Sequence, residues 1–318
     1  MPDCVESMAY FGQVPWHGKG TQVDHAMTAA EAIALGGMDW AVSMRPVELA
    51  GVPVPGYSWT VRDDTGAPLG LVGANYHPIQ NTELFTFFDP LVNREEGTFF
   101  HTVGVLKGGK RVWLLAKIPG DFYVVKDDRV GNYLLIASSH DGSLELSIFH
   151  TPIRVVCNNT LSAALTAAED YTLPIVRIRH TAGASERIKL AHQALGLATK
   201  RVEVMAALYQ RFARVKLGVL QFKEYLQHVV PSSKEERSGI PSAMIQEARD
   251  TIERLYDAGI NNLDPDFTHT AWSALNATTH YLDHSRQMRR GSDRLESSWF
   301  GTGRDMRDRA VSWLRKLV

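Results

Sequence analysis

Residues 99–118 have the sequence FFHTVGVLKGGKRVWLLAKI, and this stretch predicts the fold more clearly than any other. Two apolar runs, Phe99–Leu106 and Arg111–Ile118, are rich in β-branched and aromatic residues and flank Lys107-Gly108-Gly109-Lys110. Adjacent glycines favour the positive φ angles of a tight two-residue turn between antiparallel strands. The stretch therefore predicts a β-hairpin whose turn is flanked by the lysines Lys107 and Lys110.

Similar runs predict further strands on both sides of this hairpin. They lie at Asp39–Leu49, Tyr57–Arg62, Pro68–Tyr76, Tyr133–Ser138 and Leu144–Val156. Within one of them, alternation places Tyr57, Trp59 and Val61 on one face, which is typical of a half-buried strand. Two helices are expected among the strands, one beginning at Asn81 as its N-cap and one over Leu161–Ala168.

From Ala184 the pattern becomes helical. Apolar residues recur at steps of three and four from Ile188 to Phe212, which predicts a long helix with a narrow apolar seam. That seam can pack on its own domain or on a neighbouring subunit. Further helices are expected over Ser242–Ala258, from Asp264-Pro265 through Leu282, and over Arg304–Leu317.

These patterns together predict an α+β fold. A mainly antiparallel sheet with a hairpin and two packed helices is expected in residues 1–173, followed by a helical half with basic segments in residues 174–318.

The composition is that of an ordinary globular protein, with 44% hydrophobic and 22% charged residues in 318. A run of about 18 apolar residues is missing, so a membrane-spanning helix is not expected. The first residues lack the features of a signal peptide. The only cysteines, Cys4 and Cys157, are far apart, as is typical of reduced thiols. We therefore expect a cytoplasmic protein.

Charge is distributed unevenly along the chain. The net charge is −1, yet residues 174–218 contain nine Lys and Arg against two Asp and Glu. Residues 285–318 form a second basic block, and acidic stretches precede both blocks. Such blocks either pair with acidic side chains in the fold or form a phosphate-binding surface.

No convincing catalytic constellation is present in the sequence. Phosphate-loop, dinucleotide-binding and nucleophile-elbow patterns are missing. Adjacent acids such as Asp127-Asp128 stand beside turn signals and are expected in solvated turns. His280 and His284 have the spacing of two metal ligands on a helix, but no third ligand is evident. We therefore expect neither catalytic residues, nor a metal, nor a cofactor.

The segment Thr151–Thr160 is a better candidate for binding. A strand that carries Arg154 leads directly into a helix capped by Asn158 or Asn159. Helix N-termini expose unpaired N–H groups, so this arrangement can form a phosphate cradle. The alternative is that both asparagines serve the turn alone and that Arg154 pairs with a nearby acid.

Five stretches in this order resemble the phage/plasmid-like protein family, also called domain of unknown function 932. They are Pro15–Gly20, Ala74–Asn81, Arg154–Asn159, Ala271–Ala277 with Tyr281–His284, and Ser298–Gly303. The resemblance implies a gene of a mobile element in a bacterial or viral setting, so the expected location is the cytoplasm of a bacterial host cell. Such elements encode single-strand annealing proteins of the RecT, Redβ and Erf kind, which form rings or filaments and which this chain resembles in outline.

The resulting expectation is a homo-oligomeric protein that binds and anneals single-stranded DNA without a cofactor. Arg154, Asn158, Asn159, Lys107, Lys110 and Arg111 are expected at the nucleic-acid backbone, with Arg177, Arg179, Lys200 and Arg201 forming an outer wall. The aromatic residues Phe99, Phe100 and Trp113 are candidates for stacking on bases. Two alternatives remain open: an assembly protein that binds no nucleic acid, and a metal-dependent nuclease.

Overall fold

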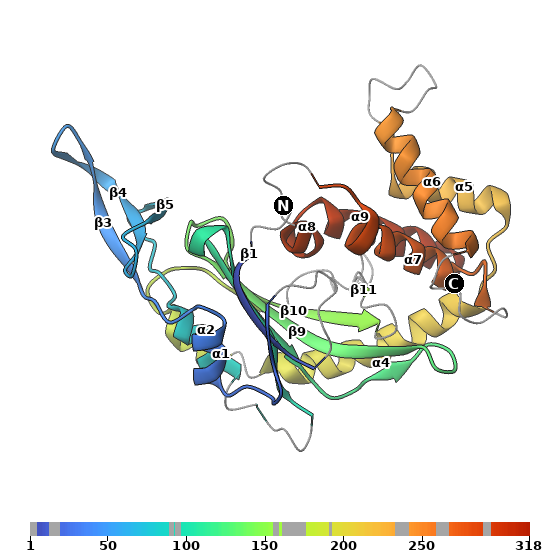
Figure 1. The fold of residues 1–318 in the computed structure, drawn as a ribbon, viewed down its shortest axis with the longest axis horizontal. Helices are drawn as coiled ribbons and strands as arrows, with labels where there is room; N and C mark the ends of the chain where they lie inside the picture. The colour runs from blue at the N-terminus through green and yellow to red at the C-terminus, as the bar shows by residue number, and fades with distance from the viewer. Residues whose placement is uncertain are drawn as a thin grey trace.

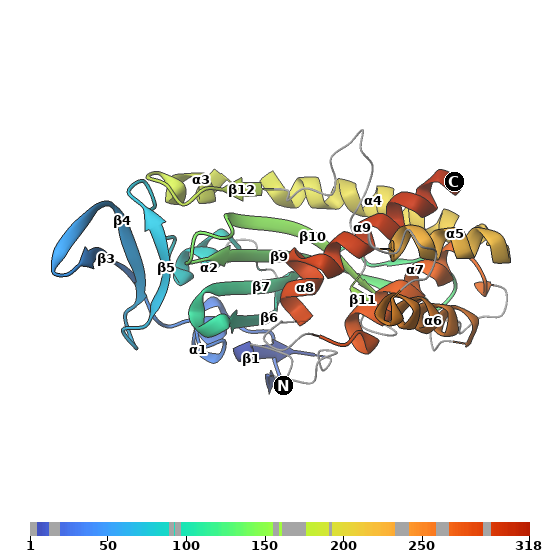
Figure 2. The ribbon, with the colours of Figure 1, turned by 90° about the horizontal axis from the view of Figure 1, so that it is seen from above.

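The computed structural model describes residues 5–12, 20–88, 92, 97–154, 159–160, 176–190, 193–232, 242–258, 267–288 and 294–318. The fold is α+β, with most strands in the first half and most helices in the second (Figure 1). A large sheet forms the centre, a small sheet projects at one end, and helices gather at the other end (Figure 2). Among the described helices, none is both long enough and apolar enough to cross a membrane.

The large sheet has the strand order β11-β10-β9-β7-β6-β1-β2, with β12 beside β10 and β8 beside β9. Its strands are β1 Val5–Phe11, β2 Thr21–Val23, β6 Phe99–Leu106, β7 Arg111–Lys117, β8 Phe122–Tyr123, β9 Arg129–Ser139, β10 Leu146–Arg154, β11 Asn159–Thr160 and β12 Val176–Ile178. All pairs are antiparallel except β1 with β2. The sequence predicted β6, β7, β9 and β10 but not β1.

The predicted hairpin is formed by β6 and β7, although its turn differs from the expected one. Pairing ends at Leu106 and Arg111, so four residues connect the strands instead of two. Lys107, Gly108 and Gly109 form a short 3-10 turn, and all three have positive φ angles. A side chain at Gly109 would contact the ring of Trp40 at 3.1 Å, so glycine is required there by its neighbour as well as by its backbone.

Both faces of the large sheet are covered by helices. Helices α1 Ala29–Leu35, α2 Asn81–Phe88 and α3 Ala184–Leu190 pack on one face. Helix α8 Arg294–Phe300 lies on the other face, where Trp299 packs against Trp113 with ring centroids 4.7 Å apart. Both β12 and α3 follow residue 173 in the chain and yet belong to the sheet layer. The predicted helix over Leu161–Ala168 lies outside the described residues.

Asn81 begins α2 as predicted, but its side chain is not a helix cap. Its Nδ2 donates to the carbonyl oxygens of Met38 and Trp40, at 3.1 and 3.0 Å, and its Oδ1 lies 2.8 Å from Nε2 of His140. Asn81 is therefore a buried link between α2, the chain before the small sheet and the end of β9.

The helical half has its own apolar core. It consists of α4 Gln193–Arg214, α5 Val219–Val229, α6 Ala243–Ala258, α7 Ala271–His280 and α9 Thr302–Leu314. The sequence did not predict α5. Helix α7 lies at the centre, with its first nine residues all buried. It begins at the capping residue Thr270, later than expected, and continues as a π-helical turn over Tyr281–Ser285.

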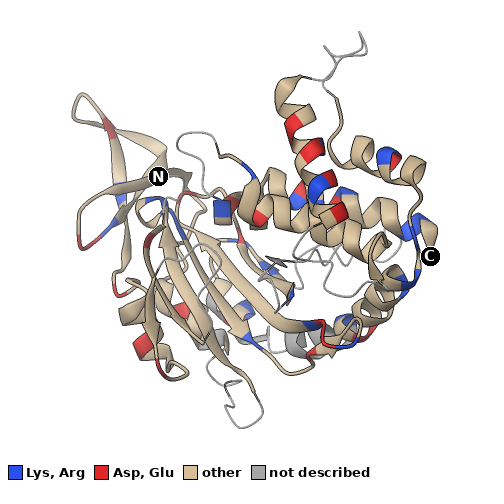
Figure 3. Cartoon of the chain, turned by 45° about the vertical axis from the view of Figure 1, so that its right-hand side comes forward, with Lys and Arg blue, Asp and Glu red and all other residues tan. Residues whose placement is uncertain are grey.

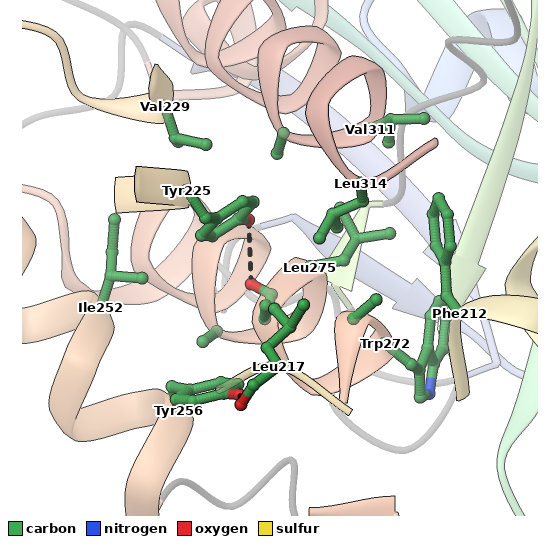
Figure 4. Close-up of a cluster of buried hydrophobic side chains, with 14 of the residues drawn as sticks. Phe212, Leu217, Tyr225, Val229, Ile252, Tyr256, Trp272, Leu275, Val311 and Leu314 are labelled. Carbon is green, nitrogen blue, oxygen red and sulfur yellow. Dashed lines mark hydrogen bonds between the residues drawn. The ribbon is translucent and has the colours of Figure 1, made fainter. Parts of the chain in front are cut away.

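Figure 4 shows how this core is built around α7. The hydroxyl of Tyr225 on α5 lies 2.6 Å from Oγ1 of Thr278 and donates to the carbonyl of Ala274 at 3.1 Å. Tyr209 and Phe212 on α4 are buried in the same cluster. The described part of the predicted seam on α4 therefore packs within its own chain.

The small sheet is formed by β3 Val42–Leu49, β4 Val52–Arg62 and β5 Pro68–Gly73, in that order. The prediction of a half-buried β4 is confirmed, but the opposite face is the buried one. Thr60 and Arg62 are buried, whereas Tyr57 and Trp59 are exposed. Thr60 donates to the carbonyl of His140 at 2.6 Å, and Arg62 pairs with Glu6 and Asp64, so polar partners on the body explain this orientation.

Candidate nucleic-acid interface

One long side of the molecule is formed by β12, α3 and α4, and we call it the basic side (Figure 2). These elements contain the basic block of residues 174–218 that the sequence singled out. Figure 3 shows Lys and Arg positions along α4. The fold thus places the segment that contains these cations along one side of the molecule.

Three arginines of the basic side are fully available to a ligand. Arg177 on β12 and Arg211 and Arg214 on α4 are exposed. Within the described part of the chain, none of these three side chains has a hydrogen bond or an ion pair. Guanidinium groups without a fixed acid are suited to contact phosphate oxygens.

The other described arginines of this side are only loosely held or half-buried. The side chain of Arg179 is 80% exposed and lies 3.1 Å from Glu145, an arrangement that contributes little to stability. Arg187 donates to Thr181 Oγ1 at 2.7 Å. Arg201 is half-buried beside His150, and with the burial of that imidazole it lowers the pKa of His150 to about 3. Lys200 lies on α4, but its side chain is outside the described residues.

The hairpin cations lie three strands away from β12 in the same sheet and are held by α8. Nζ of Lys107 and Nη1 of Arg111 lie 2.7 and 2.8 Å from Oε1 of Glu296. Lys110 is exposed at the same turn. Of the predicted base-stacking residues, Phe100 and Trp113 are 0% and 1% exposed, so both are core residues.

Arg154 is buried where the sheet meets the helical half. Its exposed fraction is 2%, and its Nε and Nη2 donate to the two carboxylate oxygens of Asp128 at 2.6 and 2.7 Å. Trp272 on α7 donates from Nε1 to the same carboxylate at 2.8 Å. We call Asp128, Arg154 and Trp272 the polar junction. A contact between Arg154 and a phosphate stays a prediction, and it would require this pair to open.

The prediction that Asp128 lies in a solvated turn is wrong, because Asp128 is 6% exposed and joins two elements. Its partners are 26 and 144 residues away in sequence, so no local pattern identifies it. Asn159 belongs to β11, where its backbone pairs with that of Arg154. Asn158 lies outside the described residues, and so does Cys157.

A second buried ion pair lies between the π-helical turn and α9. Arg307 bonds to Asp283, and its Nη1 donates to the carbonyl of Ser298 at 2.7 Å. The hydroxyl of Ser298 donates to Asp283 at 3.0 Å. Arg154, Trp272, Asp283 and Ser298 come from three of the five stretches that carry the family resemblance. Those stretches therefore supply polar contacts that join the sheet to α7 and the π-helical turn to α8 and α9.

The rings of His280 and His284 are in contact, with centroids 4.5 Å apart and planes tilted by 34°. Burial and the neighbouring His284 lower the pKa of His280 to about 4. In the described ranges no third His, Cys, Asp or Glu joins them in a group that could hold a metal ion.

The class of protein defined by these features is an α+β protein with one basic side and a buried polar junction. The chain belongs to the family described as domain of unknown function DUF932, whose model matches residues 68–299. The stretch Pro15–Gly20 lies outside that match.

A local similarity to two tRNA-specific 2-thiouridylases MnmA is also found. The protein of Pasteurella multocida is 38% identical and that of Actinobacillus pleuropneumoniae serotype 5b is 36% identical, each over 74 residues. These residues are 23% of this chain, which spans only 19% of the length of either relative. No solved structure matches the chain.

Proposed function

We propose that this protein binds single-stranded DNA along its basic side, assembles into a homo-oligomer and anneals complementary strands in phage or plasmid recombination. The observation that carries the proposal is the set of exposed arginines on β12 and α4 that have no acidic partner among the residues that the structure describes. Cations already paired in the fold cannot exchange partners at low cost, whereas these can replace the counterions of a phosphate backbone.

The proposed mechanism requires no cofactor. Arg177 near one end of the basic side and Arg211 and Arg214 near the other contact phosphates of the same strand, and Arg179 joins them when its weak pair with Glu145 opens. A strand held by its backbone keeps its bases turned outward, so a complementary strand can pair with them. Neighbouring subunits extend the basic side and hold a longer strand.

The experiment that tests this proposal is a salt series of binding to labelled single- and double-stranded oligonucleotides. The test variant combines Arg177→Gln, Arg211→Gln and Arg214→Gln. The matched control combines Lys126→Gln, Arg254→Gln and Lys316→Gln, which removes three exposed charges from other parts of the molecule.

We expect tight, salt-sensitive binding to single strands by the natural protein. Each lost phosphate contact lowers the slope of log K against log salt by about 0.7, so the test variant is expected to lose about two in slope. The control variant is expected to retain the natural slope. Equal losses in both variants, or no binding at low salt by the folded natural protein, would overturn the proposal.

A further inference from the structure

The hairpin of β3 and β4 projects away from the body of the molecule (Figures 1 and 2). We call residues 45–59 the arm. None of the fifteen is buried, although the arm is rich in apolar residues. Leu49 is 74% exposed, Val52 65%, Tyr57 54% and Trp59 38%, and Leu71 of the neighbouring β5 is 49% exposed.

An arm of this kind lacks a core of its own. Two-stranded hairpins are marginally stable in water, because they bury little apolar surface on either face. Trp59 lies directly opposite Leu71 and Arg45 in the sheet, so these side chains form one continuous exposed face. A contiguous apolar face that is exposed on the surface of a protein marks an interaction site.

The composition of the arm fits a protein partner better than a nucleic acid. Arg45 and Glu48 are its only charged residues, whereas a phosphate backbone requires clustered cations. Aromatic residues and arginine with few other charges are typical of the centre of protein interfaces. The fifteen residues of the arm and the six of β5 approach the roughly 20–30 residues that a stable interface uses on each side.

The opposite end of the molecule offers a second apolar surface. Val219 and Leu220, at the start of α5, are 72% and 77% exposed. Helix α5 and the arm lie at opposite ends of the long axis (Figure 2). Two different surfaces at opposite ends permit head-to-tail association, which gives a ring if it closes and a filament if it does not.

We propose that the arm docks on the α5 end of a second copy of this chain and thereby builds the oligomer. This inference rests on the self-association in the proposed function, but not on its nucleic-acid binding. The mass of the assembly without nucleic acid tests the arm, and the salt series tests the basic side, so either can fail alone.

The experiment measures the mass of the full chain by light scattering, together with its thermal unfolding. The arm variant combines Leu49→Glu with Val52→Glu, and the α5 variant combines Val219→Glu with Leu220→Glu. Met244→Glu is the control, because Met244 on α6 is 68% exposed and belongs to neither surface.

We expect the natural protein and the control to be oligomeric, and each double variant to be a monomer with an unchanged melting temperature. An equimolar mixture of the two variants retains one intact arm and one intact α5 surface, so it is expected to form a dimer and nothing larger. A monomeric natural protein, an arm variant of natural mass, or a mixture that stays monomeric would each overturn the proposal.

Discussion

The polar junction and the basic side both contain arginines, but the guanidinium group is buried and paired at the junction and exposed on the basic side. At the junction, Arg154 is buried and bonded to both oxygens of Asp128. On the basic side, Arg177 is exposed and has no acid in the described part of the chain. The comparison teaches that the role of an arginine is set by the acid that the fold places beside it.

The largest effect is expected from breaking the junction. Arg154→Ala leaves the carboxylate of Asp128 buried without its cation, which typically costs about 3–5 kcal/mol of unfolding free energy. Arg154→Lys is expected to recover only part of this loss, because a single ammonium cannot bond both oxygens as the guanidinium does. Urea unfolding followed by circular dichroism measures both variants.

Arg177→Ala is the matched control for that measurement, and it should change the unfolding free energy by less than about 0.5 kcal/mol. Equal stability of Arg154→Ala and Arg177→Ala would contradict the distinction between the two regions. It would also indicate that the pair with Asp128 is weak enough for Arg154 to leave it and contact a phosphate.

A second prediction concerns the stability of the protein at low pH, because burial favours the neutral state of a histidine. Burial lowers the pKa of His140 to about 3, and burial with nearby Arg201 does the same for His150. In both residues Nε2 meets an asparagine Oδ1, while Nδ1 is buried with no hydrogen-bond partner among the described residues. Protonation would therefore add a buried N–H group that has no acceptor.

The sign of the effect follows from the lowered pKa values. Below pH 6.5, the ordinary pKa of histidine, these imidazoles are protonated in the unfolded chain but stay neutral in the folded protein. The free energy of unfolding therefore falls as the pH drops from 6.5 toward 3. Each histidine contributes at most about 1.4 kcal/mol per pH unit in this window. Urea unfolding at several pH values measures the slope.

His150→Gln should flatten that slope, because it removes one such group. The control is His25→Gln, since His25 is exposed and the hydrogen bond to Asp24 raises its pKa, so its removal cannot flatten the slope. An unchanged slope in His150→Gln would show that this imidazole is not held neutral by the fold.

The sequence predicts those features whose causes are local. The apolar, β-branched and aromatic runs Phe99–Leu106 and Arg111–Ile118 predicted β6 and β7, because one hairpin contains both the strands and the turn that pairs them. Apolar spacing likewise predicted most of α4 and α9, and the turn residues on either side of it predicted α6. These elements satisfy their backbone groups and apolar faces by rules that operate over a few residues.

Features with distant causes were missed. Asn81 has the propensity of a helix cap, but the carbonyls that it satisfies belong to Met38 and Trp40. Asp128 has the neighbours of a turn residue, yet its role depends on Trp272. The exposed aromatic residues of the arm follow a buried-strand pattern, because alternation does not tell which face meets the body. The sequence shows the basic block. It does not show which of the arginines in the block have no acidic partner among the described residues.

The smallest expected effect separates the hairpin cations from the basic side. Lys107 is bonded to Glu296, so Lys107→Gln should leave the salt slope of single-strand binding unchanged. Arg177→Gln should lower the slope by about 0.7, since it removes one free cation from the proposed interface. Both variants are expected to unfold close to the natural midpoint, because each group lies at the surface.

Glu296→Gln sharpens the same comparison without removing a cation. It releases Lys107 and Arg111 from their acid, so the slope rises only if a strand passes over the hairpin turn. We expect no rise, since the proposed strand follows β12 and α4 and does not cross β10, β9 and β7 to the hairpin turn. A steeper slope in Glu296→Gln, or a shallower one in Lys107→Gln, would extend the proposed interface across the face that carries α8. It would also show that a lysine paired with a surface acid can still bind a phosphate.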